Sequence, residues 1–253
     1  MTNGSRQATT DADRPEDRRA GATCLAYAGG AGIGDQLMLS TVARELKRRG
    51  HGRVFVLTEY PDLFRHNADV GGTAIPGTRQ GESFIEQSDR RCLDLTYLIN
   101  YNLVTEERDQ PPDPILAYLC RMAGVTGRVD LRPYVTLSDA ERGWGAPYCG
   151  YIAVQSTAGG ARSRSLNKEW FPERFAEVAA HLIKSHAVVQ VGSAQDPPVP
   201  CTHDLRGGTS LRQLAAVFSH CRMYVGLEGM PMHMARAVDC PSVIVYEIGR
   251  AHV

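Results

Sequence analysis

The stretch "SLRQLAAVFSHCRMYVGLEGMPMHMARAVDCPSVIVY", residues 210–246, alternates helical patterns with short apolar runs. Residues 210–221 and 231–240 carry apolar side chains at helical spacing, whereas 223–228 and 241–246 are continuous apolar runs of strand length. Helix and strand that alternate in this order are typical of a parallel sheet with right-handed crossover connections. This stretch therefore predicts one half of an α/β fold.

The same alternation continues toward the N-terminus. Further strands are predicted at residues 151–157, 187–193, 23–28, 53–59 and 92–98, and further helices at 172–186, 34–50 and 113–125. Residues 132–150 separate two such groups, because their prolines and glycines break the periodicity. We therefore predict an α/β protein of two doubly wound domains, residues 22–140 and 148–246, that face a cleft. Ligands of such sheets bind beyond the carboxyl ends of the strands.

Composition excludes several classes of protein. The 253 residues include 28 basic and 28 acidic side chains, so no net charge recruits nucleic acid or an anionic membrane surface. No apolar run reaches the roughly 20 residues that a membrane-spanning helix needs. The seven cysteines form no CxxC pair, which disfavours zinc and a disulfide framework and favours the cytoplasm. Residues 1–21 have almost nothing apolar to bury and are predicted to be a disordered leader.

A glycine-rich turn follows the first predicted strand in "YAGGAGIGDQL", residues 27–37. Its glycines fit neither G-x-G-x-x-G nor the P-loop pattern, and the last position of the dinucleotide fingerprint falls on Asp35. A carboxylate at this position would repel a pyrophosphate bound at the helix N-terminus. Two interpretations remain. Asp35 starts a helix, as the macrodipole favours, or it faces a second molecule that Gly32 and Gly34 admit close to the backbone. The segment alone favours the first.

A second candidate turn lies in "QSTAGGARSRSLNKEWFPERF", residues 155–175, between a predicted strand and a predicted helix. It carries the hydroxyls of Ser156 and Thr157, two adjacent glycines, and several cations that include Lys168. Hydroxyls, backbone N–H groups and a lysine near a helix start can hold a diphosphate. A solvated basic loop is the alternative interpretation of the same residues.

A third candidate segment is "VGLEGMPMHMARA", residues 225–237. Glu228 and Gly229 follow a predicted strand, and His233 lies in the first turn of the next predicted helix. The three segments each follow a strand, so their polar residues are expected to point into one crevice. This convergence favours a functional site over three unrelated loops.

These residues resemble glycosyltransferase family 9, the family of the ADP-heptose:lipopolysaccharide heptosyltransferases. Residues 32–50, "GIGDQLMLSTVARELKRRG", are similar to its G-D-x-L-x-x-(T/S) opening, and "NKEWFPERFAEVAAHL", residues 167–182, to its K-x-W-x-x-x-x-(F/W) segment. Residues 205–246 are similar to its D-L-x-G-x-T-S-L-x-E-L-A pattern and to the V-G-x-(D/E)-(S/T/G)-G-x-x-H-x-A-x-A that follows.

The resemblance implies the GT-B fold, in which two Rossmann-type domains face a cleft, with an acceptor-side first domain and a second domain that binds a nucleotide sugar. It implies transfer of a heptose-like sugar to an acceptor hydroxyl, with inversion and without a metal or other cofactor. Asp35 matches the proposed general base, with Gly32 and Gly34 beside it. Lys168 matches the lysine that meets the donor diphosphate.

The same resemblance implies roles in donor binding for other residues. Ser156 and Thr157 match phosphate-side hydroxyls, while Glu228, Gly229 and His233 match residues that border the donor sugar and its phosphates. Gly229 replaces the usual Ser or Thr, and Met230 stands where glycine is commoner. These two departures concern the sugar pocket rather than the fold.

The last seven residues, "EIGRAHV" at 247–253, follow a predicted strand directly. The codons GAG-ATC-GGA-AGA-GCA-CAC-GTC encode them and spell the start of a common sequencing-library adapter, whose next codon is a stop. We therefore expect 247–253 to be a non-native tail and the second domain to be C-terminally truncated. Chance is the alternative explanation.

The sequence thus predicts a cytoplasmic glycosyltransferase, at most in peripheral contact with the inner face of the cell membrane. Its partners are a nucleotide-sugar donor, with ADP as the expected nucleotide, and a glycan or small-molecule acceptor. One alternative is a GT-B-like protein that binds a nucleotide sugar or a partner without catalysis. The other is a nicotinamide-dependent oxidoreductase, which the broken glycine fingerprint disfavours.

Overall fold

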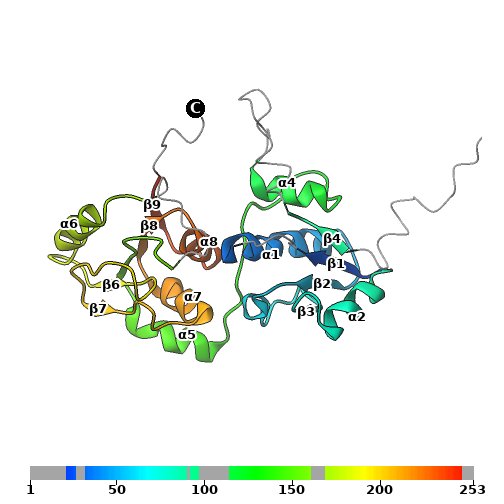
Figure 1. Ribbon diagram of the computed structural model, residues 1–253, viewed down its shortest axis with the longest axis horizontal. Coiled ribbons are helices and arrows are strands. Elements are labelled where there is room, and N and C mark those ends of the chain that lie inside the picture. The colour runs from blue at the N-terminus through cyan, green and yellow to red at the C-terminus, as the bar shows by residue number, and fades with distance from the viewer. Residues whose placement is uncertain (1–20, 27–31, 90–91, 97–113, 161–168, 247–253) are drawn as a thin grey trace, which may run out of the picture.

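The computed structural model describes residues 21–26, 32–89, 92–96, 114–160 and 169–246. It consists of two α/β halves side by side, with α1 (Ile33–Arg48) and α8 (Met230–Ala237) in contact between them (Figure 1). The predicted α/β class and the two parallel sheets are confirmed. The expectations for residues 1–20 and 247–253 lie outside the described residues.

The first half contains a four-stranded parallel sheet in the order β3-β2-β1-β4. Its elements are β1 (Thr23–Ala26), α1, β2 (Val54–Leu57), η2 (Pro61–Phe64), β3 (Gly72–Ala74), α2 (Arg79–Gln87), β4 (Cys92–Asp94) and α4 (Ile115–Met122). The strands β1 and β2 are predominantly buried and apolar, as strands covered on both faces must be.

The second half contains a five-stranded parallel sheet in the order β7-β6-β5-β8-β9. Its elements are α5 (Asp139–Gly145), η4 (Ala146–Tyr148), β5 (Ile152–Val154), α6 (Pro172–Leu182), β6 (Val188–Gln190), β7 (His203–Asp204), α7 (Leu211–His220), β8 (Met223–Leu227), α8 and β9 (Ser242–Val245). This half repeats the strand order of the first and adds β9 at the edge.

The strand order marks one expected ligand-binding position in each half. In the first sheet, β2 and β3 extend from β1 toward one edge, whereas β4 lies on the other side of β1. In the second sheet, β6 and β7 extend from β5 toward one edge, whereas β8 and β9 lie on the other side of β5. Ligands of open α/β sheets bind at the carboxyl ends of the strands at such reversal points. We therefore expect a ligand to bind near the turns that follow β1, β4, β5 and β8.

Helix α1 is buried over most of its length, including polar residues such as Ser40 and Glu45. It contacts β2, α4 and α8, so no long solvent-facing stripe remains. Its Glu45 carboxylate pairs with Arg49 at 2.6 Å and with Arg48 at 3.0 Å, which compensates the burial of the charge. One apolar cluster continues through this helix into the second half, where it includes Phe218 and Met234. The two halves thus share a core.

Residues 132–150, predicted to separate the two groups of elements, contain the short helices α5 and η4, which were not predicted. The Ser138 hydroxyl accepts the Glu141 N–H at 3.3 Å, and the Glu141 carboxylate accepts the Ser138 N–H at 2.8 Å. This capping box starts α5 despite Gly143 and Gly145. The short elements β3, α2 and β7 were not predicted either. No helix among the described residues is long and apolar enough to cross a membrane.

Candidate active site

Asp35 is fixed at the start of α1, just beyond the carboxyl end of β1. Gly32 precedes the helix in an extended conformation, and its N–H donates to the Asp35 carboxylate at 2.9 Å. A carboxylate in the first turn also interacts favourably with the helix dipole. Both effects hold the Asp35 side chain at the N-terminus of α1, where it remains partly exposed.

His233 reaches the N-terminus of α1 from the other half of the protein. A β-carbon built on the buried Gly34 would lie 2.6 Å from the His233 Cδ2 atom, so the imidazole is packed directly against the Gly34 backbone. Glycine at this position lets the ring approach. The structure therefore brings His233 next to the residue that precedes Asp35.

Glu228 and Gly229 form the turn between β8 and α8. Gly229 has φ 143° and ψ −162°, a conformation that residues with a β-carbon rarely adopt. The Ser or Thr common at this position in the resembled pattern would be strained in this backbone. The backbone conformation at position 229 therefore explains why glycine stands where the resembled pattern has Ser or Thr. The neighbouring Glu228 is partly exposed at the end of β8.

The hydroxyls of Ser156 and Thr157 point into the protein. Both residues are buried directly after β5, with exposed fractions of 0% and 2%. The Ser156 hydroxyl donates to the Pro197 carbonyl at 2.7 Å, and the Thr157 hydroxyl donates to the Asp196 carboxylate at 3.0 Å. These two hydrogen bonds fix the turn that follows β5 from its buried side. Lys168, predicted to meet a diphosphate, lies outside the described residues.

Asp196 connects two turns of the second half and was not predicted. Its carboxylate is 1% exposed and accepts the Gly159 N–H at 3.1 Å and the Ser193 N–H at 3.2 Å, besides the hydroxyls of Thr157 and Ser193. Several donors on one carboxylate compensate its burial. An aspartate three residues after Ser193, at the end of a predicted strand, was the available sequence signal.

The two turns that Asp196 connects are in close contact. Gly192 has φ 127°, and a β-carbon there would lie 2.1 Å from the Asp196 carboxylate. A β-carbon on Gly160 would lie 2.7 Å from the Ser193 β-carbon. Gly160 therefore lets the turn after β5 approach the turn after β6, whereas Gly192 admits the Asp196 carboxylate within its own turn. The turn after β5 is held against the turn after β6 as one unit.

The first half contributes further polar groups at its strand ends that sequence reasoning missed. Asp94 ends β4 and accepts the Thr96 N–H at 2.9 Å and the Thr96 hydroxyl at 2.5 Å. The Gln36 amide oxygen accepts the Glu59 N–H at 3.1 Å, which links the end of β2 to α1. Asp94 and Asp35 follow the two strands that flank the reversal point of this sheet.

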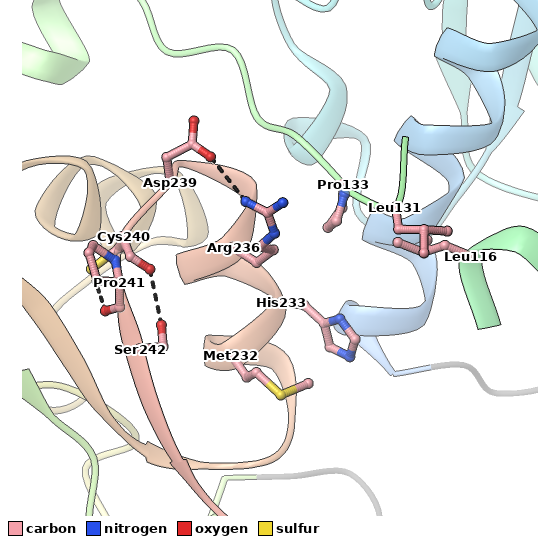
Figure 2. A pocket seen from close by; sticks show the side chains of 10 residues that line it. All are labelled: Leu116, Leu131, Pro133, Met232, His233, Arg236, Asp239, Cys240, Pro241 and Ser242. Carbon is pink, nitrogen blue, oxygen red and sulfur yellow. Dashed lines mark hydrogen bonds and ion pairs between the residues drawn. The ribbon is translucent and has the colours of Figure 1, made fainter. Parts of the chain in front are cut away.

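A pocket of about 450 Å³ lies beside His233, between α8 and the first half. Figure 2 shows Met232, His233 and Arg236 of α8 on one side and Leu116, Leu131 and Pro133 on the other. Asp239, Cys240, Pro241 and Ser242 complete the lining, and Arg236 pairs with Asp239 at 3.2 Å. Within the described part of the chain, no three His, Cys, Asp or Glu side chains are grouped to hold a metal ion.

The sequence of the second half matches a known protein family. Residues 149–250 match the family model of glycosyltransferase family 9 (heptosyltransferase). The match thus includes the first residues of the segment predicted to be a non-native tail. No curated protein matches the chain.

Solved structures with the same fold cover most of the chain. A family 9 glycosyl transferase from Veillonella parvula DSM 2008 has a TM-score of 0.66 and 13% identity, over 90% of this chain and 82% of that one. The E. coli ADP-heptose lps heptosyltransferase II has a TM-score of 0.61 and 18% identity, over 88% and 84%. E. coli heptosyltransferase WaaC with ADP-2-deoxy-2-fluoro heptose has a TM-score of 0.59 and 11% identity, over 89% and 88%.

The sequence match lies in the second half, whereas the structural likeness extends over both halves and shows a GT-B-like fold. The chain is thus a glycosyltransferase whose second half matches the model of glycosyltransferase family 9.

Proposed function

We propose that this glycosyltransferase moves a heptose-like sugar from an ADP-linked donor to an acceptor hydroxyl. The contact between Gly34 and His233 carries the proposal, because it joins the turn of Asp35 to the turn that follows β8. A proton acceptor on the first half and a donor site on the second half can then serve one reaction. The structural relatives include E. coli heptosyltransferase WaaC, solved once with ADP and once with ADP-2-deoxy-2-fluoro heptose, which supports this donor class.

The donor is proposed to bind to the second half, residues 148–246, at the ends of β5 and β8. Ser156 and Thr157 hold the first turn in place through their buried hydroxyls. Lys168 supplies positive charge to the diphosphate, and Glu228, Gly229 and His233 border the sugar. The N-terminus of α8 adds the partial positive charge of its free N–H groups.

Asp35 acts as the general base in this proposal. The acceptor oxygen attacks the anomeric carbon and forms the new glycosidic bond, while its proton passes to the Asp35 carboxylate. The bond from the anomeric carbon to the diphosphate oxygen breaks, and the nucleoside diphosphate leaves with that electron pair. Attack opposite the leaving group inverts the anomeric centre. Lys168 and the α8 N-terminus offset the developing negative charge, so the step needs no metal ion.

The acceptor is proposed to bind to the first half, residues 22–140, beside Gly32 and Gly34. Its chemical class is a glycan or a small molecule with a free hydroxyl, and the reaction is placed in the cytoplasm. The oxidoreductase alternative has no support from the family match. A protein that only binds a nucleotide sugar is the alternative that the experiment must separate.

The test measures ADP binding by calorimetry and sugar transfer from ADP-heptose for wild type and Asp35→Asn. We expect Asp35→Asn to lower kcat by about 10²–10⁴-fold and to leave the Kd for ADP unchanged, because general-base catalysis supplies a factor of that size. Asp139→Asn is the matched control, since Asp139 is an exposed aspartate in the first turn of α5.

Three results would contradict the proposal. Wild type that binds ADP without any transfer supports the binding-only alternative. Wild type that binds no ADP refutes the donor class. Full activity in Asp35→Asn refutes the role of the base. NMR of the product anomer tests inversion, and activity in excess EDTA tests independence of metal ions.

A further inference from the structure

A single arginine joins the two halves at a place distinct from the contact of α1 with α8. Arg212 is the second residue of α7, and only 5% of it is exposed. Its Nη2 donates to the Glu141 carboxylate at 2.6 Å, and its Nε donates to the other oxygen of the same carboxylate. This paired geometry fixes the plane of the guanidinium group.

The remaining N–H groups of Arg212 donate to backbone carbonyls of other segments. Nη1 donates to Asp62 at 2.9 Å and to Arg65 at 3.5 Å, both in or next to η2 of the first half. Nη2 also donates to Thr136 at 2.6 Å, in the segment that connects the halves. A guanidinium group has five N–H donors in one plane. All five are therefore used, and one side chain holds the second half, the connection and the first half together.

Glu141 determines where this guanidinium group lies. Its carboxylate also accepts the Ser138 N–H at 2.8 Å as part of the capping box of α5. Helix α5 packs against α7, so the carboxylate is fixed to the second half from two directions. The position of Arg212 relative to η2 is consequently set by the backbone, with little freedom left in the side chains.

The location of this contact gives it a mechanical consequence. The halves also touch where α1 meets α8, at Gly34 and His233. Two bodies that touch at one place can rock about it, whereas a second contact elsewhere in the interface removes that rotation. Hydrogen bonds to a charged donor in a buried site are stronger than neutral ones and require defined geometry. Rocking would break them.

We propose that Arg212 is a positioning residue, which sets the angle between the two halves and thereby the distance from Asp35 to the donor sugar. The effect on catalysis rests on the proposed function, whereas the effect on the angle does not. Arg212 contacts neither the turns that follow β5 and β8 nor the start of α1 through any of these bonds, so it acts on the reaction only through the arrangement of the halves.

The experiment compares wild type with Arg212→Gln, Arg212→Lys and the control Arg174→Gln. Arg174 forms an exposed ion pair with Glu177, so it serves as an arginine whose ion pair lies within α6 of the second half. Four quantities are measured: kcat, the donor KM, the Kd for ADP, and the radius of gyration by X-ray scattering. Hydrogen exchange of residues 61–67 reports on the η2 contact directly.

We expect Arg212→Gln to lower kcat by about 10²-fold, the size of effect that a displacement of about 1 Å produces. The donor KM and the Kd for ADP should stay within about twofold, because the donor site lies in the second half. The radius of gyration should rise, and hydrogen exchange at η2 should become faster. Arg212→Lys should recover part of kcat, since lysine keeps the charge but not the planar donors. Arg174→Gln should match wild type.

An unchanged radius of gyration and unchanged exchange in Arg212→Gln would overturn the proposal, whatever happens to kcat. Unchanged kcat with a changed radius would overturn the positioning role. If wild type transfers no sugar, the proposed function fails, while the scattering and exchange measurements still decide whether Arg212 fixes the halves. If Arg212→Gln does not fold, Glu141→Gln gives the same comparison, because it loosens the guanidinium group without removing it.

Discussion

The imidazole of His233 lies on the Gly34 backbone, so that a β-carbon on Gly34 would come within 2.6 Å of its Cδ2 atom. Gly34 belongs to the first half and His233 to the second, and Asp35 is the next residue along α1. Any change in this contact therefore alters the approach of the two halves at the position of the proposed base. The relationship can be tested by substitution of either residue.

Gly34→Ala should separate the two residues. The new methyl group displaces the imidazole or the helix, and overpacking of this kind costs about 1–3 kcal/mol against a gain of about 1 kcal/mol from helix propensity. We expect kcat to fall by about 10²-fold through misplacement of the reacting groups. Steady-state kinetics and chemical denaturation measure both effects.

Gly143→Ala provides the matched control, because Gly143 also lies in a helix and its β-carbon would meet no atom within 4 Å. This variant should be as active as wild type. The double variant Gly34→Ala/His233→Ala should regain unfolding free energy relative to Gly34→Ala, because the clash is gone. Equal stability of the two would show that His233 is not what Gly34 accommodates.

Asp196→Asn should loosen the turn that follows β5. The amide keeps one acceptor oxygen and places an NH₂ group against N–H and O–H donors, so bonds to a charged acceptor are lost at about 1.5–3 kcal/mol each before relaxation. We expect a lower free energy of unfolding and a higher donor KM, with kcat affected less. Urea denaturation and ADP calorimetry are the measurements.

Asp239→Asn is the comparison for Asp196→Asn. Asp239 pairs on the surface with Arg132 and Arg236, and such pairs contribute about 0–1 kcal/mol. Equal losses of stability in the two variants would argue against a special role for the buried carboxylate. An unchanged Kd for ADP in Asp196→Asn would show that the turn after β5 does not contribute to donor binding.

Glu141 should make the stability of the protein depend on acid pH. The hydrogen bond from Arg212 is the main cause that lowers the pKa of this carboxyl from 4.5 to about 2 in the folded state. A pKa that is lower in the folded than in the unfolded protein contributes stability above the unfolded value, and this contribution is lost as the pH falls. The window of loss is therefore from about pH 4.5 to about pH 2.

The measurement is the melting temperature of wild type and Glu141→Gln between pH 2 and pH 7, values chosen to bracket the expected window. Wild type should be the more stable above pH 4.5, and the difference should shrink toward pH 2, because glutamine does not titrate. Parallel curves over the whole range would show that the Glu141–Arg212 pair does not contribute in this way.

The sequence was sufficient for the elements whose patterns are local. The helix predicted at residues 210–221 is α7 (Leu211–His220), and Ser210 caps it by accepting the Gln213 N–H at 3.2 Å. Strands such as β8 are short, continuous apolar runs, a pattern that predicts burial on both faces of the sheet. The same patterns predicted that Asp35 lies at the start of the helix that is α1 and that Glu228 directly follows the strand that is β8.

The remaining features depend on contacts between distant residues. Nothing near Asp196 in the chain indicates that its carboxylate will meet Thr157, which lies in another turn. Arg212 is buried although it is charged, and its partners in η2, at Thr136 and at Glu141 all belong to other segments. The inward direction of the Ser156 hydroxyl depends likewise on the Pro197 carbonyl. Local propensity carries no information about these pairs.

Gly229→Ser should test the departure of this chain from the family pattern. Gly229 has φ 143°, and a side chain in such a conformation costs about 1–3 kcal/mol, although no atom lies within 4 Å of its β-carbon. We expect a loss of stability from backbone strain alone, and a higher donor KM because the turn after β8 must shift. Gly208→Ser is the control: Gly208 is exposed and lacks a positive φ, so the change should stay within about 0.5 kcal/mol. If Gly229→Ser is as stable as wild type and binds ADP equally well, the turn tolerates the serine of the family pattern. The backbone conformation would then not explain why this chain has glycine at position 229.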